Sequence, residues 1–258
     1  MPRRDNYPEG IPSWVDLSTS DISAAREFYS NLFGWSYTDE GSDEMPYTMA
    51  KIDGASAAGM GPLQDENMPP NWTTYFAVDS ADKTAERIRE AGGTLLMEPA
   101  DAFESGRLAI AAAPGGEVFG IWEAKEHIGA EVVNEHGSIS WNELMTDDVD
   151  TALNFYAQVF GHETRTTDMG GGFMYSTLAA GERQVAGVMA KPDANIPNMW
   201  GVYFFVDDTE KALDTMKANG GQVLFGPDTT EGVGVLGGGT DPQGAYFSVI
   251  TPEQPPTD

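Results

Sequence analysis

Residues 14–21 read WVDLSTSD, and residues 141–148 read WNELMTDD. Each copy begins like a strand and ends on acidic or hydroxyl residues, which favour helix N-caps because their side-chain oxygens accept hydrogen bonds from first-turn amides. An amphipathic pattern follows, in which FY is separated from FG by three residues at 28–34 and again at 155–161. The final glycine of this motif predicts the helix end, since glycine takes the left-handed conformation without steric cost. The sequence therefore predicts a strand followed by a helix, present twice.

The duplication continues along the rest of the chain. Trp141 follows Trp14 by 127 positions, and Tyr203 follows Tyr75 by 128. Each half contains two strand–helix–strands units, which gives four βαβββ modules. A single module exposes one sheet face and must pair with another to cover its core. The predicted boundaries are a leader at 1–11, a first domain at 12–124, a linker at 125–137, a second domain at 138–252 and a tail at 253–258.

Composition restricts the classes of function. The chain has no cysteine, which excludes disulfides, thiolate nucleophiles and cysteine metal sites. It has 14 basic and 41 acidic residues, and a net charge of −27 argues against nucleic acid or an anionic membrane as a partner. Neither a signal-peptide core nor an apolar run of membrane-spanning length is present, so a cytoplasmic protein is expected, either a monomer or a homodimer.

The order of these motifs resembles one superfamily. Four βαβββ modules, the FY-x₃-FG helix endings and the P-x-G turn before the last strand of each half are similar to glyoxalases, bleomycin-resistance proteins and extradiol dioxygenases, the vicinal oxygen chelate group. The segments 12–17, 127–130 and 141–144 resemble a two-domain actinobacterial branch of that group. The resemblance implies an α+β fold of tandem glyoxalase-like domains. In each domain two paired βαβββ modules would form a curved sheet, with helices outside and a ligand cleft inside.

Metal-using members of the superfamily place His, Glu or Gln at four cleft positions. Three of these positions can be placed here by their distance from the motifs, and the fourth lies within 57–61 and 185–189, neither of which contains His, Asp or Glu. Divalent metals in proteins are bound by imidazole or carboxylate donors, so these positions differ from those of metal-using members. We therefore expect no metal and no other cofactor. The residues at the three placed positions are Trp14, Thr73 and Gly120 in the first half and Trp141, Gly201 and Ser248 in the second.

Strand alternation predicts which other side chains share the clefts, because every second residue of a strand faces the same side. Asp16 and Glu143 would each supply one carboxylate. Arg107 is expected to face the first cleft, where anionic ligands would then be preferred, because Val235 replaces it in the second half. The remaining ligand-binding candidates are aromatic: Tyr75, Trp122, Tyr203 and Tyr246.

Two interpretations of these residues stay open at the level of sequence. Trp14 and Trp141 either fill the space of the absent metal or stack on a ligand. Asp16 and Glu143 are either structural or, as catalytic residues, partly desolvated general acids or bases with a raised pKa. The three histidines, His127, His136 and His162, lie in the linker or in loops and are not expected to be ligands.

Three hypotheses of function follow. The first is a small-molecule binder for an aromatic or carbonyl compound in metal-free clefts, because aromatic-lined sites with few polar groups are typical of ligand pockets. The alternative is a metal-independent lyase, isomerase or hydroxylase-like enzyme that uses Asp16 or Glu143. A third hypothesis is an interaction protein with vestigial clefts. A cleft filled by its own side chains would favour this last interpretation.

Overall fold

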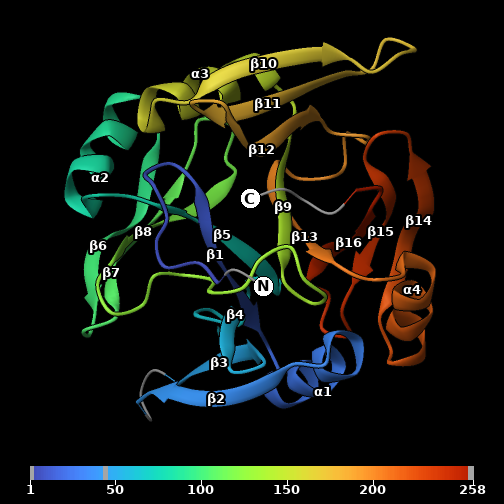
Figure 1. Ribbon diagram of the computed structural model, residues 1–258. Helices are drawn as coiled ribbons and strands as arrows, with labels where there is room; N and C mark the ends of the chain where they lie inside the picture. Colours follow the sequence, from blue (N-terminus) through green and yellow to red (C-terminus); the bar gives the residue numbers. More distant parts are fainter. Residues whose placement is uncertain (1–2, 43–45, 255–258) are drawn as a thin grey trace.

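The structure is a computed structural model that describes residues 3–42 and 46–254 (Figure 1). The first half contains β1 (Pro12–Thr19), α1 (Ile22–Phe33), β2 (Ser36–Gly41), β3 (Pro46–Ile52), β4 (Ala55–Pro62), β5 (Asn71–Ala77), α2 (Ala81–Glu90), β6 (Thr94–Ala102), β7 (Gly106–Ala112) and β8 (Val118–Ala124). The second half repeats this order with β9 (Ile139–Thr146), α3 (Val149–Phe160), β10 (Glu163–Asp168), β11 (Met174–Ala180), β12 (Arg183–Ala190), β13 (Met199–Phe205), α4 (Thr209–Ala218), β14 (Gln222–Thr230), β15 (Gly234–Thr240) and β16 (Tyr246–Pro252).

The duplicated strand–helix stretch forms as the sequence predicts. The Asp21 side chain accepts a hydrogen bond from the amide of Ala24, and Gly34 ends α1 at a φ of 72°. In the second half Asp148 caps α3 through the amide of Thr151. These caps fix where each helix begins and ends, and with it the direction in which β1 and β9 enter the sheets.

Each half forms its own eight-stranded mixed sheet. The strand order is β2-β3-β4-β1-β5-β8-β7-β6 in the first half and β10-β11-β12-β9-β13-β16-β15-β14 in the second. The predicted α+β fold of tandem domains, with curved sheets and helices outside, is confirmed (Figure 1). The inner face of each sheet, the side away from the helices, is thus made entirely within one half.

The hydrophobic cores, by contrast, combine the two halves. Helix α1 packs beside α4, and α2 beside α3, so the first module of each half shares a core with the second module of the other (Figure 1). The ring of Phe33 lies 4.9 Å from that of Phe204, and the ring of Phe76 lies 4.8 Å from that of Phe160. The halves are therefore one folding unit in energetic terms, since neither keeps its core when separated.

Two buried tyrosines mark the contact between the halves. The hydroxyl of Tyr29 accepts a hydrogen bond from the indole of Trp72 at 3.1 Å and donates to Asp241 at 3.1 Å. Tyr156, the equivalent residue of α3, accepts from Trp200 at 2.8 Å. The carboxylate near Tyr156 is instead Glu117, which is 1% exposed and has no hydrogen-bond partner within the described part of the chain. In both contacts an indole thus donates to a tyrosine hydroxyl, but the carboxylate is hydrogen-bonded to the tyrosine only at Tyr29.

The described part of the predicted leader, residues 3–11, is irregular, yet it is part of the packing. The amide of Gly10 donates to the carbonyl of Ala77, and the carbonyl of Gly10 accepts from His162 Nε2 at 2.7 Å. The linker repeats this contact in the other half, where the carbonyl of Gly137 accepts from the indole of Trp35 at 2.9 Å. Among the described residues no helix combines the length and apolar character needed to cross a membrane.

Candidate functional site

The inner face of the second sheet is organised around Glu143 on β9. Its neighbour across the sheet is Gly201 of β13, and the Tyr203 hydroxyl donates to Glu143 Oε1 at 2.9 Å. From the other side the Tyr175 hydroxyl, on β11, donates to Glu143 Oε2 at 2.7 Å, and the indole of Trp141 donates to that hydroxyl at 3.1 Å. Trp141, Tyr175, Glu143 and Tyr203 therefore form one hydrogen-bonded chain, which we call the second quartet.

Burial sets the protonation of this quartet. Glu143 is 8% exposed, and burial raises the pKa of its carboxyl, while the hydrogen bonds from Tyr175 and Tyr203 oppose that shift. Burial and the negative charge of Glu143 raise the pKa of Tyr175 and of Tyr203 well above the ordinary value. Both phenols therefore stay protonated and act as donors, and a carboxylate that accepts from two donors still has lone pairs free for a ligand.

The inner face of the first sheet carries the equivalent residues. Both Tyr75 and Tyr47 hydroxyls donate to Asp16 Oδ2, at 3.1 and 3.4 Å, and the indole of Trp14 donates to the Tyr47 hydroxyl at 2.9 Å. Burial raises the pKa of Asp16 to about 6, against the lowering effect of the two phenols. Trp14, Asp16, Tyr47 and Tyr75 form the first quartet.

Tyr47 and Tyr175 were missed by the sequence reasoning, although both complete a quartet. They stand 128 positions apart, on β3 and β11, so the offset of the repeat was an available signal. Each phenol crosses the intervening strand above a glycine, where a Cβ at Gly59 or at Gly187 would collide with the hydroxyl. Strand β4 or β12 must therefore carry glycine at this position for the tyrosine to reach its carboxylate.

These glycines lie within the two segments in which the fourth ligand of metal-using members is expected. Gly59 pairs with Asp16, and Gly187 pairs with Glu143, within the segments 57–61 and 185–189. Within the described residues there is no group of three or more His, Cys, Asp or Glu side chains placed to hold a metal ion. Each inner face offers one carboxylate that is already hydrogen-bonded to phenols, a donor set that does not fit a divalent metal.

The other predicted inner-face residues lie where alternation places them. Thr73 pairs with Asp16, and the ring of Tyr75 covers Gly120 so closely that a Cβ there would collide with it. In the second half Ser248 pairs with Tyr203, and its hydroxyl lies 3.0 Å from that of Tyr246.

Arg107 is the exception, and its predicted orientation is wrong. Its guanidinium forms two 3.0 Å hydrogen bonds with Asp82 of α2, on the helix-covered side of the sheet. The pairing of Arg107 with Glu123 explains this orientation, because Leu108 and Trp122 are the pair that faces inward. Arg107 therefore does not face the first cleft, and the preference for anionic ligands that was expected from it there has no basis.

The part of the first inner face around Trp14 and Trp122 is covered by the linker, while Asp16 and Tyr47 are partly exposed. The imidazole of His127 packs edge-on against Trp14, with ring centroids 4.5 Å apart, and 5.7 Å from Trp122, whose indole donates to the His127 carbonyl at 2.8 Å. Trp14, Tyr75 and Trp122 are 3%, 6% and 7% exposed. Burial lowers the pKa of His127 to about 4, so the imidazole that covers this face is neutral.

The second inner face is more open. The side chains of Trp141, Tyr175, Tyr203 and Tyr246 are all partly exposed, and Phe225 of β14 lies beside Ser248. The residue at the position equivalent to His127, Pro255, lies outside the described residues. Four partly exposed aromatic rings thus surround one buried carboxylate in the second half. In the first half Trp14 and Tyr75 are buried, whereas Tyr47 is partly exposed like Tyr175.

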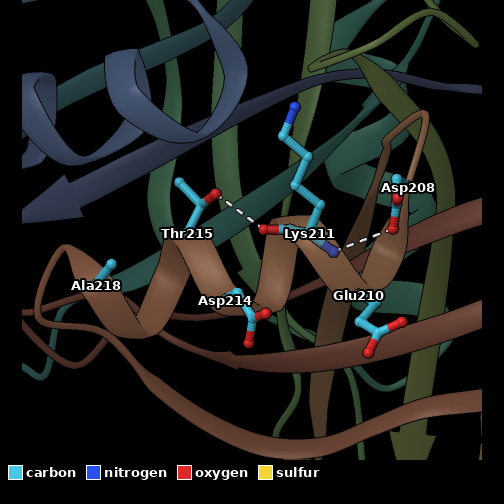
Figure 2. Close-up of a pocket in the computed structure, with 6 residues that line it drawn as sticks. All are labelled: Asp208, Glu210, Lys211, Asp214, Thr215 and Ala218. Carbon is cyan, nitrogen blue, oxygen red and sulfur yellow. Dashed lines mark hydrogen bonds between the residues drawn. The ribbon is translucent and has the colours of Figure 1, made fainter.

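A surface hollow elsewhere lies along α4 and is bordered by Lys211, Asp214 and Thr215 (Figure 2). The hydrogen bonds drawn there are the N-cap, in which the Lys211 amide donates to Asp208 Oδ1, and the bond that the Thr215 hydroxyl donates to the Lys211 carbonyl. Both belong to the helix itself, so this hollow has no arrangement of groups for catalysis.

Comparison with known proteins agrees with the fold. The family model "Glyoxalase/Bleomycin resistance protein/Dioxygenase superfamily" matches residues 11–121 and again 138–249. The "Putative glyoxylase CFP32" of Mycobacterium tuberculosis is 42% identical over 260 residues, covering 98% of each chain. The "Anthracycline biosynthesis protein DnrV" of Streptomyces peucetius is 35% identical over 266 residues, covering 95% of this chain and 94% of the relative.

Solved structures share the fold at much lower identity. The 2,3-dioxygenase LapB of Pseudomonas sp. KL28 superposes with a TM-score of 0.68 at 16% identity, covering 96% of this chain and 93% of that one. The Mn(II)-bound glyoxalase of Novosphingobium aromaticivorans gives 0.64 at 18% identity, with 97% and 86% covered. On these matches, and on the duplicated βαβββ architecture, the chain belongs to the glyoxalase, bleomycin-resistance protein and dioxygenase superfamily.

Proposed function

We propose that the protein binds a small aromatic or carbonyl compound on the inner face of its second sheet, without a divalent metal ion. The observation that carries this proposal is the second quartet, in which a buried carboxylate accepts from two phenols beneath partly exposed rings. Ligand sites generally combine such apolar walls with a few convergent polar groups. The relatives named for anthracycline biosynthesis and as a glyoxylase support a ligand of this class.

The first inner face is proposed to be structural. His127, Trp14 and Trp122 fill it, which corresponds to the hypothesis of a vestigial cleft, applied to one half only. Its carboxylate therefore provides a matched control for every variant of Glu143.

Binding is tested by calorimetric titration with 2-naphthol, which carries an aromatic surface and one hydroxyl donor. Glu143→Gln should weaken binding by roughly tenfold or more, because a hydrogen bond to a charged group contributes about 1.5–3 kcal/mol. Asp16→Asn should leave the affinity unchanged. Equal weakening by both substitutions, or by neither, would contradict the assignment of the ligand to the second face.

The absence of a metal requirement is tested separately. Protein purified without chelator should hold less than stoichiometric metal by elemental analysis, and dialysis against EDTA should leave the affinity for 2-naphthol unchanged. A stoichiometric metal that survives dialysis, or an affinity that falls after EDTA and returns with metal, would overturn the metal-free proposal.

A second candidate function is proton transfer by Glu143. Burial raises the pKa of this carboxyl, and a raised pKa suits a general acid or base at neutral pH. Exchange of the α-protons of 2-tetralone in deuterium oxide, followed by NMR, reports such a step. Glu143→Gln should slow exchange on the order of 10²–10⁴-fold if the carboxylate removes the proton. Equal exchange in both proteins would leave binding as the function.

A further inference from the structure

The hairpin that joins β10 to β11 extends the second inner face beyond the sheet. Tyr175 faces inward, and Phe173 precedes it by two residues, so both side chains project from the same side of the strand. The two rings lie with their centroids 6.4 Å apart at an angle of 41°, within the range of aromatic contact. The ring of Phe173 is therefore continuous with the wall that leads to Glu143.

A methionine stands opposite this phenylalanine. The amide of Met169 donates to the carbonyl of Phe173 at 2.9 Å, and Met169 is 47% and Phe173 45% exposed. Gly170, Gly171 and Gly172 make the turn between them at φ values of 98°, 64° and 85°. The turn is closed at its base, where Asp168 Oδ1 accepts from the Gly170 amide at 2.8 Å, while the side chains of Met169 and Phe173 are uncovered.

The distance between Glu143 and Phe173 determines how long a ligand must be to contact both residues. Tyr175 reaches Glu143 by crossing β12, so its phenol lies between Glu143 and Phe173. Glu143 lies opposite Gly187, and Gly187 lies opposite Thr177, so two strand spacings and four residues along β11 separate the backbones of Glu143 and Phe173 by about 16 Å. One aromatic ring does not bridge that distance, whereas a flat system of several fused rings does.

We propose that Phe173 and Met169 form an outer subsite that makes the second inner face selective for compounds with several fused aromatic rings and a hydroxyl or carbonyl group at one end. This inference rests on the proposed binding function of the same face. The polar end of the ligand meets Glu143 and its phenols, the rings lie along Tyr175, and the far ring contacts Phe173. A small dicarbonyl compound contacts Glu143 and its phenols but does not reach Phe173.

The test is a titration series with phenol, 2-naphthol and 2-hydroxyanthraquinone, in which the hydroxyl is kept and the number of rings rises. Affinity should rise with ring number in the wild type. Phe173→Ala should weaken 2-hydroxyanthraquinone binding roughly fivefold, the range of one aromatic pair, and leave phenol unchanged. Met174→Ala is the matched control, because Met174 is adjacent and 51% exposed but projects from the opposite side of the strand.

Each outcome decides between this subsite and the function on which it rests. If 2-naphthol binding depends on Glu143 while Phe173→Ala changes no affinity, the subsite is refuted and the binding function stands. Equal effects of Phe173→Ala and Met174→Ala would also refute it, because they would report a general change of the hairpin. If no member of the series binds, both proposals fail. Melting temperatures should match in all three proteins, since both side chains are exposed.

Discussion

The two inner faces have the same four-residue plan and differ in which members are buried. Trp14 and Tyr75 are buried while Trp141 and Tyr203 are partly exposed, and the carboxylates differ in the opposite sense, because Glu143 is buried and Asp16 is partly exposed. In both, a tryptophan donates to a tyrosine, and that tyrosine and a second one donate to a single carboxylate. The first face is covered by His127, which lies in the linker and outside the strands that repeat. Duplication therefore preserved the arrangement of the strands, while a residue beyond them covers the tryptophan of the first copy.

The largest expected difference between the faces concerns their tryptophans. Trp14 is 3% exposed and packed on His127, so Trp14→Ala should lower the free energy of unfolding by about 3 kcal/mol, as for other buried aromatic truncations. Trp141→Ala should cost about half as much and should weaken ligand binding instead, because its ring is partly exposed. Urea denaturation measures both values. Equal losses would show that the faces are packed alike.

The cover of the first face should respond to pH. Burial lowers the pKa of His127 to about 4 from an ordinary 6.5, so the folded state disfavours the charged imidazole. The stability that the neutral ring contributes is present above pH 6.5 and is lost as the pH falls toward 4, by up to about 2 kcal/mol. His127→Gln should remove this part of the pH dependence. Unfolding free energies of both proteins at pH 4.5 and 7.5 measure it, and parallel profiles would contradict the buried position of the ring.

Asp16 should show the opposite sign over the same range. Its folded pKa of about 6 lies above the ordinary 3.8, so its contribution is fully present below pH 3.8 and is lost as the pH rises through 6. The loss should amount to about 2 kcal/mol in the wild type and be absent in Asp16→Asn. The difference between the two profiles, measured by urea denaturation, isolates this group from His127. A variant that loses stability equally at every pH would identify a hydrogen-bonding role without the raised pKa.

The smallest effect concerns the carboxylates between the halves. Glu117 is buried without a hydrogen-bond partner among the described residues, so Glu117→Gln should raise the free energy of unfolding at pH 7.5 by about 1 kcal/mol. Asp241 accepts from the amides of Gln243 and Ala245 and from Tyr29, so Asp241→Asn should lower it by a similar amount. Thermal melts at that pH measure both. Destabilisation by both variants would show that Glu117 has a partner in solution.

The sequence predicted the fold because its signals are local and occur twice. Helix caps, the FG endings and the offset of the repeat placed α1, α3 and most strands. Strands β2 and β10 were not predicted, because they are polar edge strands without an alternating apolar face, as in SYTDEG at 36–41. The sharing of cores between halves was left open, since no local pattern determines which module pairs with which.

The site was predicted less completely. Alternation within one strand placed Asp16 and Glu143 inward, yet it misplaced Arg107, whose inward neighbour is Leu108. Tyr47 and Tyr175 reach their carboxylates across a neighbouring strand, and His127 covers its face from the linker. Contacts of this kind depend on which strands are adjacent, information that the pattern of a single strand does not contain.

The most direct test is a crystal structure of the protein soaked with 2-naphthol. We expect ordered density for the ligand beside Trp141, Tyr203 and Tyr246, with its hydroxyl within hydrogen-bonding distance of Glu143, while Trp14 and Trp122 remain covered by His127. Ligand density between Trp14 and Trp122 with His127 displaced, or equal occupancy of both faces, would contradict the account.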